Sequence, residues 1–163
     1  MSPLTGWRRF LGTCALVCAA FQSVAALLML FGIVELSTYG AVDRRPTYSW
    51  AGLLLPLATA LGAAAAVGTA WRARRGAGSY GHLLASHAVM LTAAIILVLL
   101  EEPGQRPSRV LLQPGSSLPP NEIFGSEWPL VVEYWLILLA GGLAVPGTLL
   151  TLPLMFADRQ RRE

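Results

Sequence analysis

Lysine is absent from this 163-residue chain, and charge of either sign is scarce. Only 13% of the residues are charged, against about 25% in an ordinary soluble domain. The apolar share is 55% and the mean hydropathy is +0.57. These values favour a membrane protein over a soluble globular domain. All twelve basic residues are arginine, which is typical of a GC-rich bacterial gene and favours the bacterial inner (plasma) membrane as the location.

Catalytic and cofactor motifs are also lacking. The sequence contains no H-E-x-x-H, no G-x-S-x-G, no phosphate-binding glycine loop and no C-x-x-C. The two cysteines, Cys14 and Cys18, lie together in one apolar block, so they imply no disulfide framework. The arginines form short clusters beside apolar blocks and not a basic stripe, so nucleic acid is not an expected partner. The sequence thus favours a protein that is not an enzyme.

Four apolar blocks dominate what is present. Each reaches the roughly 20 residues that a helix needs to cross a bilayer, and without barrel-like alternation such segments must be helices. The first block continues through Leu30 and Ile33, which is too long for a cleaved signal peptide. We expect one domain, an all-α integral membrane four-helix bundle with the lipid bilayer as its main partner. The expected helices span about 10–34, 50–71, 81–100 and 129–156, with outer loops at 35–49 and 101–128.

The arginines predict the orientation of an up-down-up-down bundle. Eight of them flank the two chain ends and the middle turn, and four lie in the two long loops. Because arginine concentrates on the cytoplasmic side, both termini are expected in the cytoplasm. The longer loop contains five prolines and two apolar clusters, Val110–Leu112 and Ile123–Phe124, so an ordered outer surface is one expectation.

Small residues recur every four positions in the second helix, which is the strongest packing signal. Such a stripe lets helix backbones approach closely in lipid, either within the chain or against another subunit. In the fourth helix, Pro146 and Gly147 predict a kink that a transporter could use as a hinge. The stripe consists of Ala58, Gly62, Ala66 and Ala70.

Polar residues inside the expected spans are few: Gln22, His87 and Glu133. Such residues are costly in hydrocarbon and are functional candidates for that reason. Gln22 lies near mid-depth, where it locks helices together or lines a polar path. Glu133 lies about one turn inside the outer boundary, where its carboxylate is expected to reach interfacial water.

A soft-metal site is a further alternative. Cys14 and Cys18 are four residues apart and share one helix face. His87 and Met155 fall at a similar expected depth, and two thiols, an imidazole and a thioether suit Cu(I) or another soft ion. The plainer interpretation treats both cysteines as small packing residues and predicts no cofactor.

Three functions therefore stay open. The preferred one is a non-catalytic accessory or structural subunit that packs against other subunits of a respiratory, photosynthetic or transport complex. The second is a small oligomeric transporter or channel that uses Gln22 and Glu133, with a substrate that the sequence does not name. The third is a membrane metal or redox protein built on Cys14, Cys18 and His87.

Overall fold

The part of the chain that the structure describes folds into four long helices. The computed structural model describes residues 3–39, 49–75, 79–101 and 128–160. The helices are α1 (Pro3–Tyr39), α2 (Trp50–Arg74), α3 (Tyr80–Leu100) and α5 (Trp128–Arg159). Each of them contains an apolar segment long enough to cross a bilayer. The chain is therefore a multi-pass membrane protein with four candidate spans.

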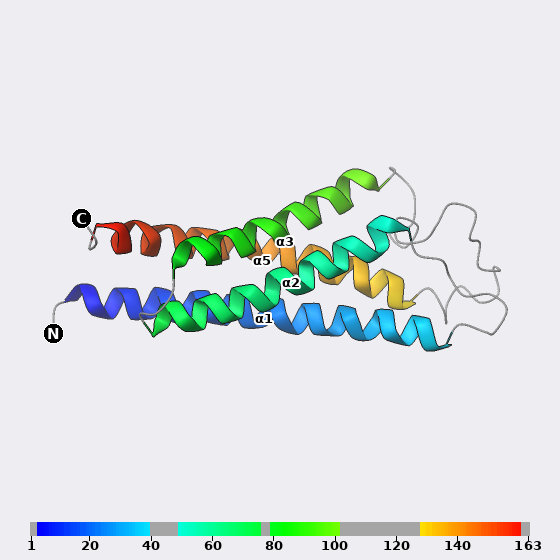
Figure 1. The fold of residues 1–163 in the computed structure, drawn as a ribbon, viewed down its shortest axis with the longest axis horizontal. Coiled ribbons are helices and arrows are strands. Elements are labelled where there is room, and N and C mark those ends of the chain that lie inside the picture. The colour runs from blue at the N-terminus through cyan, green and yellow to red at the C-terminus, as the bar shows by residue number, and fades with distance from the viewer. Residues whose placement is uncertain (1–2, 40–48, 76–78, 102–127, 161–163) are drawn as a thin grey trace.

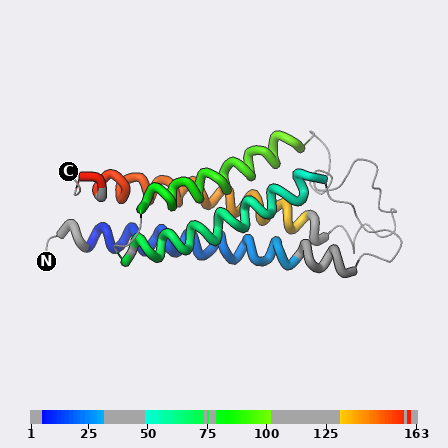
Figure 2. Tube along the Cα trace, in the orientation of Figure 1, coloured from blue at the N-terminus to red at the C-terminus, as the bar shows by residue number. Residues whose placement is uncertain are grey.

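The helices form an elongated bundle in which consecutive helices run in opposite directions (Figures 1 and 2). Around the bundle, α1 contacts α2, α2 contacts α3, α3 contacts α5, and α5 returns to α1. Two pairs of helices are not neighbours around the bundle: α2 with α5, and α1 with α3. The first pair approaches more closely than the second, so α1 and α3 lie on opposite sides of the bundle. Both chain ends lie at one end of the bundle, called the proximal end below (Figure 1). The opposite end is called the distal end.

The helix bounds differ from the expected ones mainly in α1, which begins at Pro3 and continues to Tyr39. Residues 35–39, which we expected in the first outer loop, continue α1 as a helix. No glycine or proline interrupts the sequence between Gly32 and Gly40, so no local signal ends the helix where the apolar run ends. Residues 40–48 of the first loop and 102–127 of the second loop, with its apolar clusters, lie outside the described residues.

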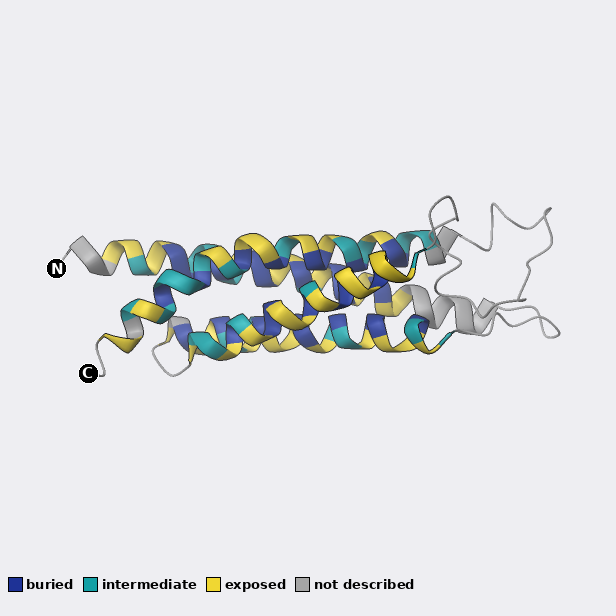
Figure 3. Ribbon diagram, turned by 90° about the horizontal axis from the view of Figure 1, so that it is seen from above, coloured by how far each residue is buried: buried dark blue, intermediate teal, exposed yellow. Residues whose placement is uncertain are grey.

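All four helices bury residues at alternating spacings of four and three. This heptad pattern is the packing geometry of left-handed helical bundles. In Figure 3 the buried residues form inward-facing stripes along the helices. The stripes consist of Leu11, Ala15, Cys18, Gln22, Ala25 and Met29 on α1; Gly52, Pro56, Thr59, Ala63, Ala66, Ala70 and Ala73 on α2; Leu83, His87, Met90, Ala94 and Leu97 on α3; and Glu133, Ile137, Ala140, Ala144, Gly147, Thr151 and Leu154 on α5.

The small-residue stripe of α2 is used inside the chain. A Cβ atom on Gly62 would lie 2.9 Å from Met90 Cγ and 3.3 Å from the Ser86 carbonyl oxygen, so α2 packs tightly against α3 there. Ala66 and Ala70 are buried in the core. Ala58 is only partly buried. Three of the four stripe residues therefore face neighbouring helices of this chain and leave little for another subunit to contact.

Side chains on α1 also bond to the backbones of its two neighbours. The Arg8 guanidinium donates to the Ala157 carbonyl oxygen at 2.6 Å, where the last carbonyls of α5 lack helical partners. The Cys18 thiol donates to the Leu143 carbonyl oxygen at 3.1 Å. On the other side, Ser23 donates to the Ala63 carbonyl oxygen at 3.2 Å. These contacts fix the register of α1 within the bundle.

We predict opposite effects for alanine at two adjacent glycines of α5. A Cβ atom on Gly141 would overlap Ala94 Cβ and lie 3.1 Å from the Met90 carbonyl oxygen, whereas one on Gly142 meets nothing within 4 Å. Gly141→Ala should destabilise the bundle by about 1–3 kcal/mol through overpacking. Gly142→Ala should be neutral or slightly stabilising, because alanine favours a helix by up to about 1 kcal/mol. Thermal unfolding in detergent measures both, and equal unfolding temperatures would contradict the close α3–α5 contact.

Candidate functional site

Gln22, His87 and Glu133 all lie inside the bundle. The exposed fractions of the three side chains are 0%, 0% and 1%. Each occupies a position of the heptad stripe of its helix, so the packing geometry itself turns it toward the core. They come from α1, α3 and α5 in that order. The structure thus places all three predicted intramembrane polar residues away from lipid.

The buried hydroxyl groups form a different class. Thr59 donates to the Leu55 carbonyl oxygen at 2.8 Å, and Thr151 donates to the Gly147 carbonyl oxygen at 2.6 Å. Ser86 donates to the His82 carbonyl oxygen at 2.9 Å. In each case the acceptor lies one turn earlier on the same helix, which is how hydroxyl side chains are commonly satisfied inside helices. These groups need no further partner, so they are weak candidates for a site.

Gln22 connects three helices. Its amide nitrogen lies 3.2 Å from the Ala140 carbonyl oxygen on α5 and 3.4 Å from His87 Nδ1 on α3. Because α1 and α3 lie on opposite sides of the bundle, the contact with His87 crosses the core. The two hydrogens of the amide nitrogen allow both bonds at once. Sequence reasoning found both residues but not this pairing, because it depends on the relative rotation of two helices that are not neighbours.

The same contacts determine the protonation pattern of the His87 ring. The Ala140 carbonyl oxygen is only an acceptor, so the Gln22 atom that faces it must be the amide nitrogen. His87 Nδ1 faces that donor and therefore acts as an acceptor. In a neutral imidazole the proton then resides on Nε2. Among the described residues, His87 Nε2 has no hydrogen-bond partner, so it presents an unused donor inside the bundle.

Gly147 makes room for the His87 ring. A Cβ atom on Gly147 would lie 2.6 Å from His87 Cε1 and 2.7 Å from Nε2, closer than real Cβ contacts allow. Any larger residue there would displace the imidazole. Pro146 and Gly147 lie within a helix that continues through both of its prolines. The hinge stays a prediction, and the structure adds a packing role for Gly147 that the sequence did not indicate.

Glu133 is buried more deeply than expected. The sequence predicted that its carboxylate would reach interfacial water, and the 1% exposed fraction shows that this is wrong. The helix carries Glu133 on the inward stripe, so neighbouring helices enclose its side chain. Neither carboxylate oxygen has a hydrogen-bond partner among the described residues. An isolated buried carboxyl group is costly in an apolar interior.

Glu133 and the Gln22 contact lie on one face of α5. Ala140 follows Glu133 by seven residues, which corresponds to two helical turns and about 10 Å along the axis. Gly147 follows after two more turns and abuts His87. The three positions therefore form one line along α5, with Glu133 toward the distal end and His87 nearer the middle. We call Gln22, His87 and Glu133 the polar core residues.

The soft-metal site is not assembled. Within the described ranges, no three or more His, Cys, Asp or Glu side chains form a group that could hold a metal ion. Cys18 is buried and its thiol is bonded to the backbone of α5, while Cys14 is partly buried. Met155 is also only partly buried. The cysteines therefore fit the packing interpretation better than the ligand interpretation.

A second polar contact lies near the distal end, and the sequence did not indicate it. The Tyr134 hydroxyl donates to a carboxylate oxygen of Glu101, the C-cap residue directly after α3. The Tyr134 ring also packs edge-to-face against Trp135, with the ring centroids 5.5 Å apart. Tyr134 is 5% exposed, so it joins α5 to α3 instead of anchoring the chain in the lipid interface. Its polar tip and apolar ring suit this boundary position.

We predict that His87 is a neutral imidazole with its proton on Nε2. The chain has only two histidines, so an ¹⁵N spectrum of histidine-labelled protein contains two imidazole pairs. The His87 Nδ1 signal should be that of an unprotonated nitrogen, and Gln22→Leu should shift it by removing the donor. His82 is exposed and serves as an internal control that should not move. A protonated His87 Nδ1, or a signal that Gln22→Leu leaves unchanged, would contradict the contact.

Comparison with known proteins gives no guide to function, so a functional proposal must rest on the polar core residues. The chain matches no family model, no curated protein and no solved structure.

Proposed function

We propose that this chain is a small membrane transporter or channel for protons or small cations, and that the polar core residues form its path. The observation that carries the proposal is the Glu133 carboxylate, which is buried among the spans with both oxygens unpartnered among the described residues. Ionisable residues inside membrane bundles are rare, and they mark ion pathways and proton relays. Ordinary packing would favour an apolar residue at this position, because an apolar residue carries no desolvation cost.

The unpartnered atoms of the polar core residues include both acceptor oxygens and a nitrogen that can exchange a proton. The Glu133 oxygens accept a proton or contact a cation, and the Gln22 carbonyl oxygen is a second acceptor without a partner among the described residues. His87 Nε2 can release or take up a proton. Along α5, Glu133 lies about 10 Å from Ala140, which Gln22 contacts, and about 21 Å from Gly147, which His87 contacts. Both separations are too long for a direct hydrogen bond. Transfer between these residues therefore needs an ion, a water molecule or a helix movement, and Pro146–Gly147 is where such a movement would be easiest.

The flux of protons into vesicles tests this proposal. Purified protein is reconstituted into vesicles that contain a pH-sensitive dye, and a pH gradient is imposed across the membrane. Vesicles with the unaltered protein should lose the gradient faster than protein-free vesicles. Glu133→Gln should lower the rate to that of protein-free vesicles, because glutamine is similar in size but cannot exchange a proton. The same assay with gradients of sodium and potassium extends the test to cations.

Glu101→Gln is the matched control. It makes the same chemical change at the end of α3, where the side chain is partly exposed and glutamine can still accept the Tyr134 bond. Its flux should equal that of the unaltered protein. Flux that is equal in Glu133→Gln and the unaltered protein, for every ion tested, would remove the transport proposal.

The second candidate is the accessory subunit, now with a different contact face. The predicted stripe of α2 faces mostly inward, but Ala64 and Gly68 are exposed on the same helix, four residues apart. A Cβ atom on Gly68 would meet nothing within 4 Å, so the backbone of α2 is open to close approach there. Small residues at this spacing let a helix of another subunit pack closely in lipid.

Purification in mild detergent tests this second candidate. Subunits of a larger complex should remain bound to the unaltered chain, and Gly68→Leu should release them by blocking close approach. Gly142→Leu is the control, because Gly142 is equally open but lies on α5. A chain that emerges alone and monodisperse would contradict the accessory-subunit role.

Both candidates share one proposed location, the inner membrane of a bacterium with the proximal end in the cytoplasm. The eight arginines that flank the chain ends and the middle turn support this orientation. A tag on either terminus that is accessible from outside intact cells would overturn it.

A further inference from the structure

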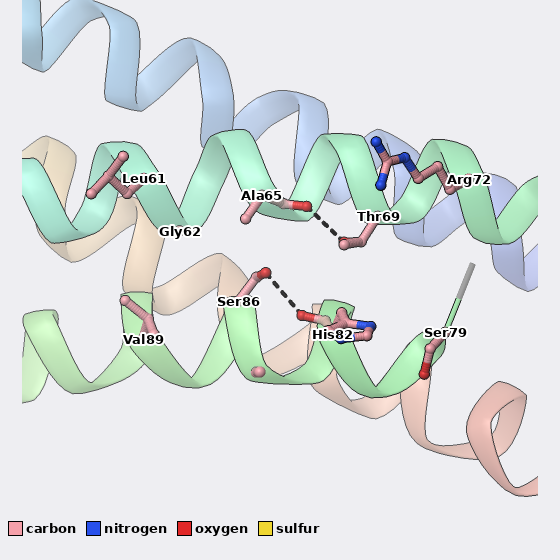
Figure 4. A pocket seen from close by; sticks show the side chains of 10 residues that line it. Leu61, Gly62, Ala65, Thr69, Arg72, Ser79, His82, Ser86 and Val89 are labelled. Carbon is pink, nitrogen blue, oxygen red and sulfur yellow. Dashed lines mark hydrogen bonds between the residues drawn. The ribbon is translucent and has the colours of Figure 1, made fainter. Parts of the chain in front are cut away.

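A groove of about 590 Å³ lies between α2 and α3, apart from the polar core residues (Figure 4). Its walls include Leu61 on α2 and Val89 on α3, both of which are exposed. Between them the lining residues are small, chiefly Gly62 and Ala65. The groove is therefore a recess in the outer surface of the bundle, in the region that the candidate spans place in lipid.

Close helix packing produces the groove. Because Gly62 has no side chain, α3 approaches until Met90 and the Ser86 carbonyl oxygen nearly touch the α2 backbone. The hydroxyl groups along the groove are turned back onto their own helices: Thr69 donates to the Ala65 carbonyl oxygen at 2.7 Å and Ser86 to that of His82 at 2.9 Å (Figure 4). With its hydroxyl donors used in this way, the middle of the groove presents a mainly apolar surface.

The groove has the length of one lipid leaflet. Leu61 and Val89 lie close to the midpoints of their spans, Trp50–Ala73 and Tyr80–Leu100. From Leu61 to Arg72 the helix rises about 16 Å at 1.5 Å per residue. Half of a hydrocarbon core of about 30 Å is about 15 Å. The groove thus runs from the middle of the membrane to its proximal surface, and it does not continue into the other leaflet.

Its proximal end is polar and carries positive charge. Arg72 on α2 lies across the opening from Ser79 and His82 on α3 (Figure 4). Ser79 caps α3 by accepting a hydrogen bond from the Gly81 amide at 3.2 Å, so the positive end of the helix dipole is also at this opening. None of the residues that line the groove is acidic. The charge therefore favours an anion at the proximal end and only there.

We propose that the α2–α3 groove binds an anionic phospholipid of the proximal leaflet. Its phosphate lies at Arg72, Ser79 and His82, and one acyl chain extends along Leu61, Ala65 and Val89 to the middle of the membrane. The length of the groove and its single charged end favour a lipid as the occupant over a helix of another protein. A transmembrane helix would continue past Leu61 and Val89 into the distal leaflet, where the groove offers it no surface.

Native mass spectrometry of the whole purified chain tests the proposal. The protein is mixed in detergent with phosphatidylglycerol and phosphatidylcholine that have identical acyl chains. Phosphatidylglycerol should be retained preferentially. Arg72→Gln should weaken its binding about five-fold, which corresponds to one arginine near an anionic lipid. Ala65→Leu should also reduce retention, because the larger side chain fills the apolar part of the groove.

Two control variants separate this site from general attraction. Arg9→Gln removes one exposed charge at the same end of the bundle but on α1, and Ala64→Leu enlarges an exposed residue beside Ala65 that does not line the groove. Both should retain phosphatidylglycerol as the unaltered protein does. Equal losses in Arg72→Gln and Arg9→Gln, or equal retention of the two lipids, would overturn the proposal. The test does not depend on ion transport, so its failure leaves the transport proposal standing.

Discussion

Helices in lipid gain nothing by hiding apolar surface from their surroundings, so this bundle depends on how closely its backbones approach. The constraint is clearest at Gly62, Gly141 and Gly147, since a Cβ atom at any of these positions would collide with α3. Much of the inward face of α2 is alanine, with Ala63 and Ala66 fully buried. Close approach lets many weak dispersion contacts form along the length of each helix. On α2 large side chains such as Leu53, Leu54 and Leu57 are instead on the outer surface, where they meet lipid.

The same close packing makes the polar core residues significant. In a loosely packed bundle, water could reach a buried carboxyl group, but here Glu133 is 1% exposed and lies on a tightly packed stripe. The buried hydroxyl groups satisfy themselves locally, while Gln22 reaches across the core to do so. Glu133 has no hydrogen-bond partner of either kind among the residues that the structure describes. A residue that keeps a desolvated carboxyl group without a partner has a cost that packing alone does not offset.

The sequence predicted the helices well because the length of an apolar span is a physical requirement of a membrane. It found Gln22, His87 and Glu133 because polar residues stand out in apolar segments. It did not predict which side of each helix faces inward. In a soluble bundle the outer face is polar and reveals the rotation of the helix, but here Leu61 and Phe21 face outward and are as apolar as the core. The buried depth of Glu133 and the contact between Gln22 and His87 both depend on that rotation.

Residue size carries the information that polarity does not. On α2 the inward positions at spacings of four and three are glycine, alanine, threonine or proline, whereas Leu53, Leu54 and Leu57 face outward. A four-residue stripe was visible in the sequence, but a strict spacing of four drifts around a helix, and this explains why Ala58 is only partly buried while Ala66 and Ala70 are in the core. Residues spaced alternately by four and three stay on one side of the helix.

Helix α3 connects the two features of the bundle that have functional proposals. Ser86 lines the groove against α2, and the next residue, His87, faces Gln22 and Gly147 in the core. One helical turn therefore contacts both the proposed lipid and the proposed ion path. Gly62 and Gly147 leave α3 in close contact on both sides, so a shift of α3 that widened the groove would also move the His87 ring relative to Gln22. One site would affect the other if α3 had two positions and both sites favoured one of them.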